Sequence, residues 1–61
     1  MKLEFQDCYG YYEVYNDKST LLGTIMFHTP WKRWTWEQEN GIIMTNDCLK
    51  DVLNFIEVLK K

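Results

Sequence analysis

The most unusual string in this sequence is Trp31-Lys32-Arg33-Trp34-Thr35-Trp36, in which aromatic and basic side chains are interleaved. Aromatic rings can stack on the bases of a single-stranded nucleic acid while nearby cations meet its phosphates. Trp31, Lys32, Arg33 and Trp36 would supply that chemistry. The alternative is a turn followed by a strand whose tryptophans fill the core. We favour this alternative, because single-strand grooves need more positive charge than a chain of formal net charge −2 offers.

Catalysis would have to centre on His28, the only histidine. A nucleophile and an orienting group should then lie near it. The candidates are Ser19, in a polar turn cluster, and two cysteines, Cys8 and Cys48, which we expect to be buried. No nucleophile motif surrounds any of them. We therefore expect a protein that is not an enzyme.

The cysteines also bear on metals and on redox state. A structural zinc site normally takes four ligands in close pairs, whereas Cys8, His28 and Cys48 are scattered along the chain. We expect no metal and no other cofactor. No secretory hydrophobic segment follows Met1, which favours a cytoplasmic protein with two reduced thiols.

The remaining signal comes from large side chains suited to protein binding. Tyrosine and tryptophan dominate interface hot spots because they bury a large area at a low cost in side-chain entropy. The alternative is that most of these side chains fill the core of a small domain. We expect a partner-binding surface centred on six residues, which are Tyr11, Tyr15, Met26, His28, Trp31 and Arg33.

A small sheet must position these residues. Residues 3–15 show a strand pattern that loses its alternation at Gly10, so we expect one long strand with a break or bulge there. We expect a second strand from Leu21 to His28, in which Gly23 should mark the close approach of a bulky neighbour. Arg33 to Gln38 predicts a third strand.

The end of the chain predicts a turn and one amphipathic helix. Asn40-Gly41 is the strongest short hairpin signal, and residues 42–44 form either a short fourth strand or an apolar strap. The helix runs from Thr45, a good N-cap, to Lys61. Its apolar stripe is expected to comprise Leu49, Val52, Leu53, Ile56 and Leu59, flanked by Cys48, Phe55 and Val58.

The expected fold class is α+β, a three- to four-stranded antiparallel meander with one C-terminal helix packed on one face, in a single domain of residues 1–61. One helix covers one face only. The helix-facing side should hold Leu3, Phe5, Tyr12, Val14, Ile25, Phe27, Trp34 and Trp36. The uncovered side should hold Tyr11, Glu13, Tyr15, Thr24, Met26, His28, Arg33, Thr35 and Glu37.

Size and charge narrow the class of partner. A chain this short buries only about 60% of its unfolded surface, so a partner chain would add to a small stability margin. We expect another protein as partner and a homo-oligomer, with a dimer favoured. The acidic charge argues against nucleic acid, and no apolar run approaches the ~18 residues of a membrane span.

The order Gly23-Thr24-Ile25, Trp34-Thr35-Trp36, Thr45 and a closing apolar helix resembles small orphan proteins of bacteriophage genomes. The resemblance covers most of the chain, but its motifs are structural and carry no catalytic residue over. It implies an accessory protein that binds a host or phage partner, for example a defence inhibitor such as an anti-CRISPR.

Overall fold

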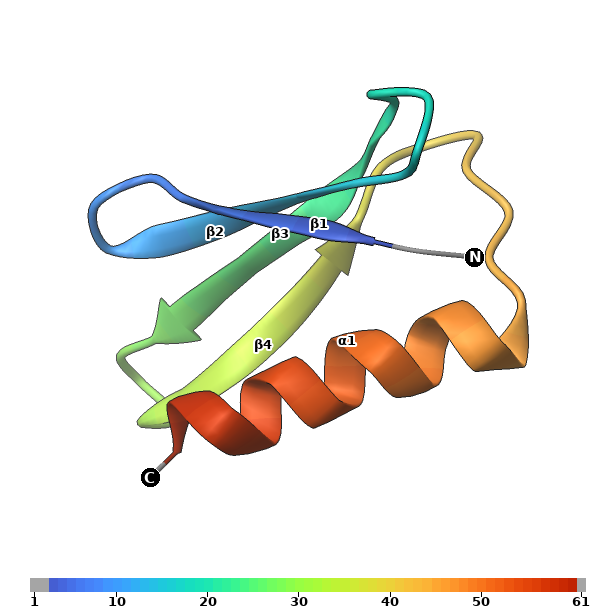
Figure 1. Ribbon diagram of the computed structural model, residues 1–61. Helices are drawn as coiled ribbons and strands as arrows, with labels where there is room; N and C mark the ends of the chain where they lie inside the picture. Colours follow the sequence, from blue (N-terminus) through green and yellow to red (C-terminus); the bar gives the residue numbers. More distant parts are fainter. Residues whose placement is uncertain (1–2, 61) are drawn as a thin grey trace.

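The computed structural model describes residues 3–60 and shows a four-stranded antiparallel sheet with one helix on one of its faces (Figure 1). The elements are β1 (Glu4–Asp7), β2 (Tyr11–Tyr15), β3 (Leu21–His28), β4 (Arg33–Gln38) and α1 (Asn46–Leu59). Their order across the sheet is β1-β2-β3-β4, so each strand pairs with the next. The predicted α+β meander with a C-terminal helix is confirmed. Expectations for Met1, Lys2 and Lys61 lie outside the described residues.

The prediction of one long first strand is wrong, because residues 3–15 form a hairpin. Tyr9 and Gly10 make its two-residue turn, with φ angles of 61° and 114°. Positive φ at both positions is what a type I′ hairpin turn requires. The Cys8 N–H donates to Tyr11 O at 2.8 Å and closes the turn. Sequence reasoning missed this turn because a tyrosine rarely occupies such a position.

The Asn40-Gly41 signal marks a turn that leaves the sheet, not a hairpin. Gly41 has a φ of 79°, and the Ile42 N–H donates to Glu39 O at 3.3 Å. Residues 42–44 then cross to the helix as an irregular strap, the second of the two predicted alternatives. Within residues 3–60 no strand follows β4.

α1 begins as predicted but ends at Leu59, before the predicted Lys61, and two of its predicted sheet-facing residues, Leu53 and Val58, are exposed. Thr45 Oγ1 accepts a hydrogen bond from the Cys48 N–H at 3.3 Å, which confirms Thr45 as the N-cap. Cys48, Val52 and Ile56 are its buried residues. Leu53 is 59% exposed, because it is turned by about 100° from Val52 around the helix axis and passes the edge of the sheet-facing side.

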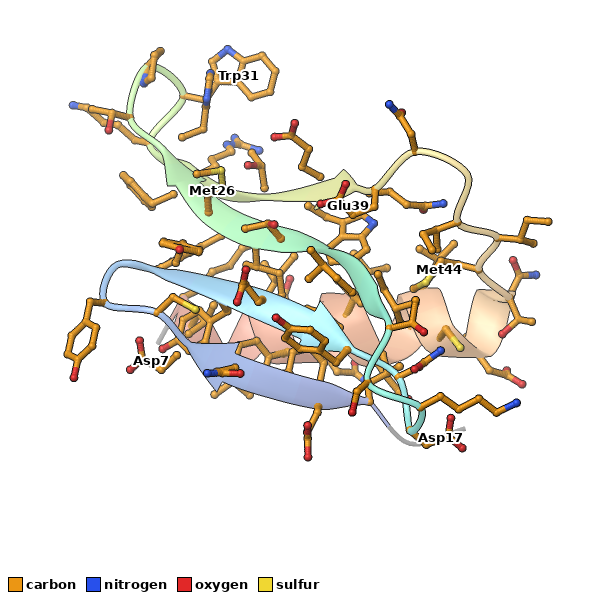
Figure 2. The ribbon with its side chains drawn as sticks, turned by 90° about the horizontal axis from the view of Figure 1, so that it is seen from above. Asp7, Asp17, Met26, Trp31, Glu39 and Met44 are labelled. Atoms are coloured by element: carbon orange, nitrogen blue, oxygen red, sulfur yellow. The ribbon has the colours of Figure 1, made fainter. Side chains whose placement is uncertain are left out.

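The strand register confirms the predicted division of the two sheet faces. Tyr12, Ile25 and Trp36 stand side by side across β2, β3 and β4. Figure 2 looks onto the opposite, open face, with α1 behind the sheet. The buried cluster between the sheet and the helix consists of Val14, Leu22, Ile25, Val52 and Ile56.

Aromatic contacts attach the helix to the first two strands. The Phe55 ring stacks on Phe5 of β1 with a centroid distance of 4.2 Å and an interplanar angle of 7°. The same ring meets Tyr12 of β2 edge to face, with centroids 5.0 Å apart. Such pairs add about 0.5–1.5 kcal/mol each beyond the area that they bury. Phe55 therefore ties the far edge of the sheet to α1.

Gly23 confirms its predicted close approach and yields a test of the packing. A Cβ at position 23 would overlap the Trp36 ring and the main-chain oxygen of Glu37. We expect Gly23→Ala to lower the free energy of unfolding by about 1–3 kcal/mol, the usual cost of overpacking a core. Denaturant unfolding measures this change. Adding Trp36→Phe should recover part of the loss, and a loss under about 0.5 kcal/mol for Gly23→Ala alone would contradict the packing described here.

Candidate partner-binding surface

The structure brings together five of the six predicted partner-binding residues. Tyr11 and Met26 face each other across β2 and β3, and His28 faces Arg33 across β3 and β4. The His28 ring meets the Trp31 ring at a steep angle, with centroids 4.6 Å apart. These residues lie on or beside the open face, toward the end of the sheet where β3 passes into β4.

Tyr15, the sixth predicted residue, stands apart from the others. It pairs with Leu21 near the opposite end of β2. Its hydroxyl donates to Glu13 Oε1 at 3.0 Å, and the Cys8 thiol lies 3.4 Å from the same oxygen. Tyr15 and Cys8 thus belong to a polar cluster around the Glu13 carboxylate.

The Glu13 carboxylate disfavours ionisation of its neighbours. Partial burial and then the hydrogen bond and charge of Glu13 raise the pKa of Cys8. The hydrogen bond to Glu13 raises the pKa of Tyr15, and the charges of Cys8 and Glu13 raise that of Tyr11. A raised pKa means that the neutral form is favoured in the folded state. The three side chains are therefore uncharged at neutral pH.

Large apolar side chains gather at one end of the sheet. Figure 1 shows the β1–β2 and β3–β4 turns at the same end, opposite the β2–β3 loop. Tyr9 is 100% exposed, Trp31 68% and Met26 41%. In Figure 2, Met26 and Trp31 lie at this end, far from Asp17 in the β2–β3 loop. We define the hairpin-end surface as Tyr9, Tyr11, Met26, Phe27 and Trp31, all exposed.

Sequence reasoning missed two members of this surface. Tyr9 was hidden by the unrecognised turn. Phe27 lies on the helix-covered face, opposite Trp34, yet it is 45% exposed. It stays uncovered because α1 ends at Leu59, beside it. No local pattern in the sequence reports where a helix ends relative to a strand residue 32 positions earlier in the chain.

Two residues at the hairpin end adopt a backbone conformation that favours glycine. Tyr9 has a φ of 61° and Lys32 a φ of 53°. The left-handed region costs an L-residue roughly 1–2 kcal/mol. The Asp7 carboxylate holds the first turn by accepting the Tyr9 N–H at 2.9 Å. The backbone conformation of both turns beside the exposed apolar side chains thus lowers the stability of the fold.

The four residues predicted to bind nucleic acid in the alternative interpretation do not lie on one face of the sheet. Trp31 and Lys32 lie in the β3–β4 turn and Arg33 begins β4, whereas Trp36 lies on the helix-covered face over Gly23. The Trp36 Nε1 is buried and has no hydrogen-bond partner among residues 3–60. The four residues therefore do not form one continuous stacking surface.

The thiols and the histidine do not form a joint site. Cys48 is buried as predicted, but Cys8 is only half-buried, and no disulfide joins them within residues 3–60. Ser19 and His28 lie at opposite ends of β3. Across the described part of the chain, no group of three His, Cys, Asp or Glu side chains could hold a metal ion.

Comparison of the chain with known protein families, with curated proteins and with solved structures finds no match. Between residues 3 and 60, no helix has the length and apolar character that a membrane crossing needs.

The raised pKa of Cys8 predicts a slow thiol. Its thiolate is the reactive form, so iodoacetamide should alkylate native Cys8 more slowly at neutral pH than it alkylates a cysteine in a short peptide. Glu13→Gln removes a charge that raises this pKa, so the variant should react faster. Mass spectrometry over time measures both rates. An unchanged or lower rate in Glu13→Gln would contradict the assigned role of the carboxylate.

The raised pKa values of Cys8 and Tyr15 also make the stability of the fold depend on pH. Because the folded state raises these pKa values, the stability from the neutral groups is present below their ordinary values of 9.0 for Cys8 and 10.0 for Tyr15. It is lost as the pH rises through the higher folded values.

Proposed function

We propose that this chain is a small protein-binding module, without catalytic activity, that docks through the hairpin-end surface. The observation that carries the proposal is the gathering of five exposed large apolar side chains at one end of the sheet. Scattered exposed apolar residues are ordinary, whereas large ones that gather at one end of a small sheet, here on both of its faces, mark a candidate interaction site. Tyrosine, tryptophan and methionine are also the residue types enriched at protein interfaces.

The surface is pre-organised, which favours binding. Tyr11 and Met26 are held by strand pairing on β2 and β3, and Trp31 is oriented by its contact with His28. Side chains that are already ordered lose less entropy on association.

The resemblance to small bacteriophage proteins extends the proposal. It makes the partner a host factor that the chain inhibits, in the manner of a defence inhibitor, and places the encounter in the cytoplasm, where both thiols stay reduced. A dimer, favoured by the small size of the chain, belongs to the same proposal. Light scattering over a dilution series tests for the dimer, and a monomer at every concentration would refute the proposed dimer.

Met26→Glu tests the surface. Met26 lies near its centre and is already partly exposed, so the variant should fold while partner affinity falls by about tenfold or more, because a charge is then buried in the interface. Wild-type and variant proteins are immobilised, proteins enriched from host extract are quantified, and the affinity of each enriched protein is measured by calorimetry. Leu53→Glu, at an exposed leucine on α1, is the matched control and should bind like the wild type. Equal enrichment by wild type and Met26→Glu would refute this surface.

Tyr9→Gly should separate stability from binding. Relief of the left-handed strain should raise the free energy of unfolding by about 0.5–1 kcal/mol, while loss of the exposed ring should weaken partner binding. Ser19→Gly is the matched control, since Ser19 has a φ of 62° in the β2–β3 loop at the other end. That loop is held by Asn16 Oδ1, as the first turn is held by Asp7. Ser19→Gly should gain stability and keep full binding, so a loss of binding in both variants would contradict the role of Tyr9.

A further inference from the structure

A hollow of about 270 Å³ opens beside the hairpin-end surface, where the end of α1 meets the start of β4. In Figure 1 this is the corner at which the C-terminal end of the helix lies next to the β3–β4 turn. The residues that line the hollow are Phe27, Lys32, Arg33, Trp34, Leu59 and Lys60.

The floor of the hollow is aromatic and partly uncovered. Phe27 and Trp34 meet edge to face, with centroids 5.6 Å apart and an interplanar angle of 76°. Leu59, the last residue of α1, closes one side. An apolar side chain placed on this floor would remove the exposed part of Phe27 from water, which is favourable in proportion to the area buried.

The rim of the hollow is basic in a chain that is acidic overall. It is lined by three of the seven lysine and arginine residues, of which Arg33 reaches it from the open-face side at the start of β4, while the formal net charge of the chain is −2. Lys60 pairs with Glu57 at 3.1 Å, and this is the one ion pair among residues 3–60. Lys32 and Arg33 therefore make no ion pair with a carboxylate in the described part of the chain.

We infer that this hollow binds an acidic peptide segment, in which one apolar side chain sits on Phe27 while flanking carboxylates meet Lys32, Arg33 and Lys60. The inference rests on the proposed protein-binding function and names the chemistry of the partner. Charge complementarity of this kind speeds encounter and selects the partner. The exposed part of Phe27 gives the apolar side chain of the bound segment its contact.

A single-stranded nucleic acid would also supply negative charge, but the hollow suits it less. Stacking platforms offer successive aromatic faces along a basic groove. Here Phe27 and Trp34 meet edge to face, so they do not offer two successive parallel faces for stacking. The structure therefore favours the acidic peptide, and the nucleic acid becomes an outcome of the test.

The first experiment uses the capped peptide Asp-Asp-Phe-Asp-Asp as the probe, titrated into the labelled full chain and followed by amide chemical shifts. The shifts should concentrate on Phe27, Lys32, Arg33 and Trp34, and the affinity should fall as salt is added. The peptides Lys-Lys-Phe-Lys-Lys and Asp-Asp-Ser-Asp-Asp should each bind about tenfold more weakly or worse. Equal binding of the acidic and basic peptides, or tighter binding of oligothymidylate than of the acidic peptide, would overturn the inference.

Matched charge variants complete the test. Lys32→Glu with Arg33→Glu should weaken binding of the acidic peptide by about tenfold or more. Lys18→Glu with Lys50→Glu makes the same change in net charge at exposed positions that do not line the hollow, and it should leave the affinity within about twofold. An equal loss in both pairs would show a general charge effect and overturn the inference.

The outcomes separate this inference from the proposed function. If the peptide does not bind but Met26→Glu still weakens binding of the partner, the hollow is not the binding site and the proposed protein-binding function stands. If the peptide binds the hollow and Met26→Glu changes nothing, the hollow stands and the open-face centre of the proposed surface is wrong.

Discussion

The packing of Val52 and Ile56 of α1 against Val14 and Ile25 of the sheet is the contact on which the rest of the structure depends. A helix of 14 residues spans about 21 Å and can cover one face of a four-stranded sheet. Within residues 3–60 no second helix lies on the other face. Tyr11 and Met26 on that face are exposed. The candidate surface thus follows from the covering of only one face by α1.

The two ends of the sheet have different characters. The β2–β3 loop is polar and is organised by the side chain of Asn16. The hairpin end combines exposed aromatic rings with left-handed backbone at Tyr9 and Lys32. A chain of this size has a small stability margin, so strain in two turns is a notable cost. Ser19 in the β2–β3 loop adopts the same conformation, so the exposed rings, and not the left-handed backbone, distinguish the hairpin end.

Charge is distributed in the same uneven way. On the open face, Glu13 holds Tyr15 and Cys8 in their neutral forms. At the corner beyond β3, Lys32 and Arg33 surround an aromatic floor. A net charge of −2 conceals this separation, because a sum over the chain carries no information on position. A chain whose summed charge disfavours nucleic acid can therefore still carry a basic hollow that suits an acidic peptide.

The sequence by itself determined strands β3 and β4, the start of the helix with its Thr45 cap, the division of the sheet faces and the close approach at Gly23, because each depends on periodicity or on a local backbone rule. It did not reveal the turn at Tyr9, since a tyrosine in left-handed conformation breaks the usual turn signals and is held there by the pairing of β1 with β2 and by the Asp7 carboxylate. It also predicted, wrongly, that Leu53 and Phe27 would be buried between the sheet and the helix. A periodic pattern says toward which side a residue points, but whether anything lies there depends on how far α1 extends across the sheet. That extent, and the meeting of both hairpin turns at one end, are set by contacts between distant parts of the chain, so only the tertiary structure decided them.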